Sequence, residues 1–397
     1  QQALGFYWQI RDFGRILSLD LSGLILERVG GAPFSQIALA LAQCPGRLKS
    51  KYPLSMLRVA WALRMAGKTE AFDALLEELR PSGDAPELAR EWALLRSFQS
   101  HPDAARMLPA LREAEALFAG ACSRVILPEH PWCFGNHSPF AEYHLAPGEA
   151  DREADVFDEY IALYSRLTGG HGGGADALFR AELAYQRGRL AEAEVFAYKA
   201  VFVAESCRQS VVQLGATLLL AHLALHNADT ARWQQAMSSM ERAAALPGQD
   251  PSVMRAILDI VRGVLLNELH HHADIAPWLR EAEQLRNCPM PAMEYAALFV
   301  HLNLLMHGGE WARLVGTIEA VRPPGGPYRE MLFSLTLAVA HLGLGHAGES
   351  ARLVRHAADQ GLPDGLVLSL AAYSCTMENV EALIEREHPA QYGAFLE

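Results

Sequence analysis

The sequence predicts an all-α protein, an α-α superhelix in which antiparallel helix pairs stack as a tetratricopeptide-like solenoid. Ala- and Leu-rich stretches alternate with short breaks marked by Gly, Asn or His, and the later breaks recur about every 40 residues. In addition, no useful length of chain alternates Val, Ile or Thr with polar residues, as strands do. One helix pair cannot bury its apolar face alone, so we expect neighbouring pairs to stack.

Six breaks separate the two helices of successive pairs. Small or polar residues mark each break, at Gly67-Lys68-Thr69, Gly188-Arg189, Asn227-Ala228-Asp229, His271-His272-Ala273, Gly308-Gly309-Glu310 and Gly345-His346-Ala347. The clearest pair runs from Leu178 to Ala204, where small residues recur at positions of close helix approach. Residues 53–79 show a weaker form of the same pattern.

Three regions follow one another along the chain. Residues 1–80 form an N-terminal helical segment, residues 81–175 form helical repeats, and residues 176–397 form the tetratricopeptide-like repeats. A loop rich in Pro and aromatic residues, 126–148, interrupts the second region, and a Gly-rich run, 169–174, precedes the clearest pair. A loop of this length inside a repeat array is uncommon unless it has a function or covers something.

Composition excludes several functions. The chain has 397 residues and a net charge of −12 without clustered Lys or Arg, which excludes a nucleic-acid surface. Its apolar stretches are too short to cross a membrane. The six scattered cysteines indicate reduced thiols in a cytoplasmic protein. The chain begins with Gln1 and has no leader-like segment, so we expect an internal fragment of a longer protein.

Catalytic and metal motifs are weak. Gly67-Lys68-Thr69 lacks the earlier Gly of a phosphate-binding loop, because Ala62 stands there. His130, Cys133, His137 and His144 have a spacing that could hold zinc, but structural histidines or an organic-ligand pocket are alternatives, and we assign no metal. The run 270–272 lies on a turn and is interpreted as solvated. No nucleophile, acid and base set has a recognisable spacing, so we expect no enzyme activity.

A ligand site is predicted where the loop meets the clearest helix pair. Its residues combine apolar walls with a few polar groups, as small-molecule pockets do, and they are Trp132, Phe134, His137, Tyr143, His144, His171, Glu182 and Tyr185. The alternative is that the aromatic side chains fill a gap between repeats. Replacing Tyr143 and His171 together separates the two, because folding survives only if these side chains serve a ligand.

Part of the chain resembles a known family. The stretches WCFGNHSPFAEYH (132–144), GHGGGA (170–175) and YQRG (185–188) resemble the central sensor region of large LuxR-type, MalT-like bacterial transcriptional regulators. Residues 4–17 and 51–53 are similar to the segment that follows the ATPase module in that family. The resemblance is sharpest from Trp132 to Ala200; elsewhere it is that of a generic helical repeat.

The resemblance implies a sensing role. Such regulators carry an ATPase module, a helical superhelix that receives an inducer or partner, and a C-terminal helix-turn-helix. This chain has neither a Walker A motif nor a basic helix-turn-helix after residue 377. ATP is therefore expected only in the missing ATPase module, DNA only through the missing C-terminal module, and no cofactor here. The expected partner is an unknown small-molecule inducer or a regulatory protein, and the alternative function is a protein-protein interaction scaffold.

Overall fold

The structure is a computed structural model that describes residues 2–22, 28–29, 32–81, 85–285, 288–321, 325–374, 377 and 380–396. Helices dominate these residues, and the predicted all-α class is confirmed. The described strands are two residues each, β1 (Arg28–Val29) and β2 (Ala32–Pro33), and they pair antiparallel. The finer superhelical path stays a prediction.

The first region consists of short helices. Its elements are α1 (Gln2–Gln9), α2 (Phe13–Leu17), α3 (Phe34–Ala42), α4 (Gly46–Lys51), α5 (Pro53–Met65) and α6 (Thr69–Glu78). Helix α5 begins at Pro53, whose fixed φ suits the first helical position. Residues 62–69 lie at the end of α5 and on its turn into α6. A phosphate-binding loop needs a strand before it, and here a helix precedes the turn.

The middle region contains the segment 126–148. Its elements are α7 (Pro86–Ser97), η2 (Phe98–Ser100), α8 (Ala104–Phe118), η3 (Trp132–Gly135), α9 (Pro139–Tyr143) and α10 (Ala150–Leu167). The predicted long loop therefore holds two short helices, η3 and α9. Ser138 explains the start of α9, because its hydroxyl accepts a hydrogen bond from the Ala141 N–H.

The remaining helices span residues 175–396, and several of them pack as consecutive pairs. They are α11 (Ala175–Gln186), α12 (Leu190–Cys207), α13 (Ser210–His226), α14 (Thr230–Ala244), α15 (Pro251–Glu268), η4 (His272–Asp274), α16 (Pro277–Arg280), α17 (Ala282–Leu285), η5 (Pro291–Met293), α18 (Glu294–His307), α19 (Trp311–Val321), α20 (Pro327–Gly343), α21 (Ala347–Gly361), η6 (Leu362–Asp364), α22 (Val367–Ser374), α23 (Val380–Glu387) and α24 (Pro389–Leu396). Asp229 and Asp250 cap α14 and α15 by accepting backbone N–H bonds.

One backbone turn recurs at all six predicted breaks. In each turn, a residue with positive φ follows the end of the helix. The N–H of that residue donates a hydrogen bond to the carbonyl oxygen three residues before it, and the N–H of the following residue donates to the carbonyl oxygen five residues before itself. These positive-φ residues are Gly67, Gly188, Ala228, His270, Gly309 and Gly345. Glycine is favoured there because a Cβ is strained at positive φ. The shared geometry confirms the predicted breaks.

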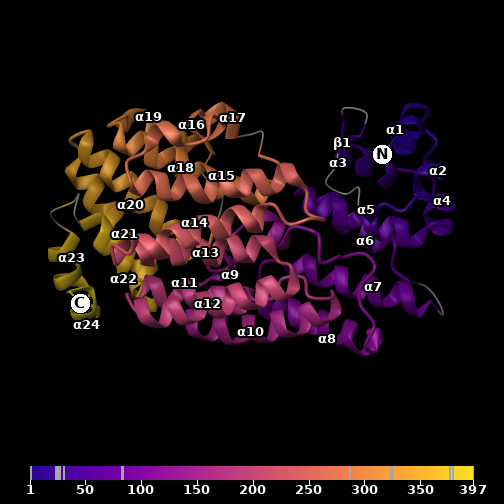
Figure 1. Cartoon of the computed structure of the whole chain (residues 1–397), viewed down its shortest axis with the longest axis horizontal. Coiled ribbons are helices and arrows are strands. Elements are labelled where there is room, and N and C mark those ends of the chain that lie inside the picture. Colours follow the sequence, from indigo (N-terminus) through magenta and orange to yellow (C-terminus); the bar gives the residue numbers. More distant parts are fainter. Residues whose placement is uncertain are drawn as a thin grey trace.

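The C-terminal helices pack back on the middle of the chain. The Asp364 carboxylate accepts hydrogen bonds from the N–H groups of Gly148 and Ala150, at 2.6 and 2.8 Å. Arg187 donates to the Asp364 carbonyl oxygen, and Ser369 donates to the side chain of Gln186. Figure 1 shows α22 beside α11 accordingly. An open solenoid contacts only neighbouring repeats, so these contacts are a departure from that rule.

Two glycines allow close packing around segment 126–148. A Cβ on Gly172, in the Gly-rich run, would lie 2.3 Å from Trp132 Nε1, and one on Gly215 of α13 would lie 2.1 Å from the His137 carbonyl oxygen. Both distances are shorter than any real contact, so only glycine fits. The Gly172 N–H also donates to Gln209. Gly172 and Gly215 thus let segment 126–148 pack closely against the Gly-rich run and α13.

Candidate functional site

A cavity of about 190 Å³ opens between the first helices of successive pairs. Residues of α11, α13, α15, α18 and α20 line it, together with residues 136–141, whereas the second helices α12, α14, α19 and α21 contribute none of the described lining. An engineered apolar cavity of about 150 Å³ holds benzene, so this cavity has room for a compact organic molecule.

Glu182 places a carboxyl group in the cavity. Its oxygen accepts a hydrogen bond of 2.9 Å from the Phe140 N–H, and the Ser138 hydroxyl also bonds to it. The side chain is half-buried, since protein surrounds it while the cavity leaves part of it accessible. Burial raises the pKa of Glu182 to about 8, although both hydrogen bonds act in the opposite direction.

Aromatic side chains form much of the cavity wall. Tyr185, Tyr295, Phe299 and Tyr328 all line it. None of the lining residues that the structure describes is Lys or Arg, and no described ion pair involves Glu182. Burial raises the pKa of Tyr328, and the nearby Glu182 charge raises it further. The described lining therefore combines the Glu182 carboxyl group, aromatic rings and the imidazoles of His137 and His222, and Arg329 lies over the Tyr295 ring at 4.4 Å from its centroid.

Hydrogen bonds fix the polar edge of the cavity. Gln186 donates to the Tyr328 hydroxyl at 3.0 Å, so α11 and α20 are tied together across the cavity. The Tyr185 hydroxyl lies 3.1 Å from His226 Nε2. Burial lowers the pKa of His137 to about 4, so this histidine is neutral near pH 7. The cavity therefore presents neutral hydrogen-bonding groups beside Glu182.

Three of the eight predicted site residues, His137, Glu182 and Tyr185, line this cavity. The other five are buried elsewhere. Trp132 stacks on Tyr143 with ring centroids 6.3 Å apart, and Phe134 packs against Trp61. These rings contact one another and the core, as expected of side chains that fill a gap between repeats.

Two of the predicted site histidines, His144 and His171, lie against polar groups of the protein. His144 Nδ1 lies 2.6 Å from Glu153, and its Nε2 lies 3.4 Å from Asp364. His171 lies 2.6 Å from the Tyr164 hydroxyl, and its other nitrogen contacts the His130 carbonyl oxygen. Burial lowers the pKa of His171 to about 3 and that of His130 to about 4. Both stay neutral under physiological conditions.

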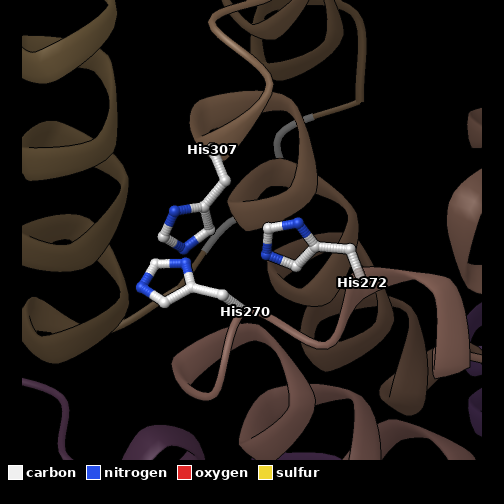
Figure 2. Close-up of side chains that lie close together, drawn as sticks. All are labelled: His270, His272 and His307. Atoms are coloured by element: carbon white, nitrogen blue, oxygen red, sulfur yellow. The ribbon is translucent and has the colours of Figure 1, made fainter.

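The possible zinc set of the loop does not assemble. His130 uses both ring nitrogens, because Nδ1 accepts from Trp61 and Nε2 contacts the Ser22 carbonyl oxygen. Within the described part of the chain, one group instead gathers three metal-ligating side chains, namely His270, His272 and His307 (Figure 2). His270 and His272 belong to the run 270–272, which the sequence analysis interpreted as solvated, whereas His307 ends α18. The described cysteines are free thiols, while Cys375 lies outside the described residues.

Sequence reasoning missed the far wall of the cavity. Tyr295, Phe299, Asn303 and Tyr328 come from α18 and α20, more than a hundred residues after Glu182. Their only local signal is their place on the first helix of a pair, which faces inward in stacked pairs.

Comparison with protein-family models finds no match, and comparison with curated proteins finds none either. Within the described ranges, no helix combines the length and the apolar character that crossing a membrane requires.

Proposed function

We propose that this chain is a sensing domain that binds a small cationic organic molecule in the cavity around Glu182. The observation that carries the proposal is the buried carboxyl group in an aromatic-walled cavity whose described lining has no Lys or Arg. A carboxyl group in such a place ionises readily only beside a positive partner, and a ligand ammonium group would supply one. An anionic ligand would find no positive counter-charge there.

The aromatic wall favours the same ligand. A cation over the face of a tyrosine or phenylalanine ring is attracted by the ring quadrupole, by about 2 kcal/mol when desolvated. Tyr185 and Phe299 offer rings around the volume that Glu182 borders, while the Tyr295 ring already has Arg329 over it. The expected ligand is therefore a compact amine with an apolar body.

Binding would act through helix pairs that are distant in sequence. Helices α11, α13, α15, α18 and α20 line the cavity, so one ligand can contact several of them at once. It can shift a conformational equilibrium only by its different affinity for the two arrangements. A ligand that binds between α11 and α20 would favour the arrangement in which Gln186 donates to the Tyr328 hydroxyl.

Three probes of the same size test the ligand class. Benzylamine is cationic near pH 7, benzyl alcohol is neutral and benzoate is anionic. We expect benzylamine to bind at least about tenfold more tightly than benzoate in isothermal titration calorimetry, a difference of about 1.4 kcal/mol. Glu182→Gln should remove that preference. Glu192→Gln, on the outer helix α12, is the matched control and should retain it. Equal or tighter binding of benzoate would contradict the proposal.

We further propose that the domain belongs to a cytoplasmic LuxR-type, MalT-like transcriptional regulator. The residues of 132–144 and 170–188 support this through their resemblance to that family's sensor region. In such a regulator the ligand signal would pass to an ATPase module and a helix-turn-helix. Sequencing the complete reading frame tests the assignment. An upstream ATPase and a downstream helix-turn-helix are expected, and the absence of both would contradict it.

The alternative is an interaction scaffold, and one observation favours it. Helix α12 exposes Val195, Tyr198 and Phe202 on one face, and Phe202 is 74% exposed. Exposed apolar patches often contact another protein. RNA sequencing of strains that carry variants of the complete gene separates the two functions. Under the sensor proposal, Glu182→Gln alters the regulated transcripts and Phe202→Lys does not; under the scaffold alternative, the reverse holds.

A further inference from the structure

The turn after α15 has a histidine at its positive-φ position, where most of the other five turns of the same geometry have glycine. His270 has a φ of 57°, and four of the five equivalent positions are glycine. A left-handed residue with a side chain costs about 1–2 kcal/mol. The backbone of His270 is therefore mildly strained. Such strain is a reason to look for a function of the His270 side chain.

Three imidazole rings converge beside this turn. His270 lies on the turn after α15, His272 is the first residue of η4, and His307 is the last residue of α18. Ring centroids lie 4.7 Å apart for His270 and His307, and 5.0 Å apart for His272 and His307. Figure 2 shows the three rings turned toward a common point. One nitrogen from each ring lies within 4.8 Å of the others.

Within the described part of the chain, the cluster contains a buried ring nitrogen whose hydrogen-bonding capacity is unused. Nε2 of His272 is buried and has no hydrogen-bond partner among the described residues. Neighbouring His271 differs, because its ring turns toward Asp274 at 3.5 Å and stays outside the cluster. A buried imidazole nitrogen without a partner is costly, and a metal ion would satisfy it.

We propose that His270, His272 and His307 form a binding site for a divalent transition metal ion, with Zn²⁺ as the best fit. Imidazole nitrogens are preferred ligands of zinc, and three of them leave a fourth tetrahedral position for water or an outside ligand. Tetrahedral coordination at about 2.0–2.1 Å requires the nitrogens to lie about 3.4 Å apart. The rings therefore draw together by about an ångström on binding, which exposed His270 and His307 can do by rotating.

The ion would join two consecutive helix pairs. Two ligands follow α15 and the third ends α18, so coordination links successive turns on one edge of the array. Since the unfolded chain does not hold these side chains together, zinc stabilises the folded state. The melting temperature should therefore rise with zinc concentration.

Calorimetric titration of the 397-residue chain, without an affinity tag, tests the site with ZnCl₂ as the probe. We expect one ion per chain with a Kd of about 10 µM or lower. His272→Ala and His307→Ala should each weaken binding at least about tenfold, because each removes one of three ligands. His271→Ala is the matched control, since it removes an adjacent exposed histidine outside the cluster, and it should bind like the unmodified chain.

A second titration tests whether zinc binds instead to His341 and His346, two neighbouring histidines whose Nδ1 atoms lie 3.2 Å apart. His341→Ala should leave zinc affinity unchanged. Circular dichroism of every variant checks that the helices are intact. The proposal is overturned if the unmodified chain binds no zinc below about 100 µM, or if folded His272→Ala and His307→Ala bind as well as His271→Ala.

Discussion

The Glu182 carboxyl group accepts a hydrogen bond from the backbone N–H of Phe140 at 2.9 Å. This contact joins the first helix of the clearest repeat to the short helix α9 that the loop contributes. It also holds the acidic group at the cavity edge. The raised pKa of Glu182 makes both its charge and its effect on stability testable.

The stability of the chain should depend on Glu182 in one pH window. Its pKa is about 8 in the folded chain and ordinarily 4.5, so between these values the folded chain keeps a proton that the unfolded chain has lost. The contribution is full below 4.5 and lost as the pH rises through 8. From about pH 5 to about pH 9, the free energy of unfolding should fall by at least about 1 kcal/mol more in the unmodified chain than in Glu182→Gln.

Urea denaturation at the two pH values measures this difference. Other titrating groups are common to both proteins and cancel in the comparison. Glu192→Gln, whose carboxylate is exposed, should follow the unmodified chain. Parallel pH profiles for Glu182→Gln and the unmodified chain would mean that Glu182 is ionised in the folded state at neutral pH.

Gly188→Val should destabilise the turn between α11 and α12. Gly188 has a φ of 73°, and a β-branched residue is strongly disfavoured there. No atom lies within 4 Å of the added Cβ, so the loss of about 1 kcal/mol or more comes from backbone strain alone. Thermal melting measures it. Gly316→Ala, inside α19 and equally unobstructed, is the control and should melt at the same or a higher temperature.

Tyr143→Ala combined with His171→Ala should unfold the chain or lower its melting temperature strongly. Both side chains are buried, at 4% and 2% exposure, and both pack among the rings of α10. Truncating one large buried aromatic residue costs about 3–5 kcal/mol. Tyr143→Phe, which keeps the ring, should remain folded. A double variant that melts like the unmodified chain would restore the ligand-binding interpretation of these two residues.

The helix pairs could be predicted from sequence because their turns need a residue at positive φ. Gly67, Gly188, Gly309 and Gly345 mark those positions directly, whereas Ala228 and His270 adopt the same geometry without glycine. The return of the C-terminal helices could not be predicted. It rests on Asp364 meeting the N–H groups of Gly148 and Ala150, and no local pattern marks such a distant contact.

The candidate site was predictable only in part. Glu182 and Tyr185 lie on a regular helix, and that helix faces inward, so periodicity could place them. Segment 126–148 is different, because Cys133 and Phe134 both adopt left-handed conformations that interrupt the helical path. Side-chain directions there follow no period. The loop aromatics therefore packed into the core instead of the cavity wall.

Proton release on benzylamine binding tests the central claim most directly. At pH 7 a carboxyl group with a pKa of about 8 is mostly protonated, and pairing with an ammonium group ionises it. Calorimetry in phosphate and Tris buffers, whose ionisation enthalpies differ, should report about nine-tenths of a proton released per benzylamine bound, and none for Glu182→Gln. Binding without proton release in the unmodified chain would contradict an ammonium ligand paired with Glu182.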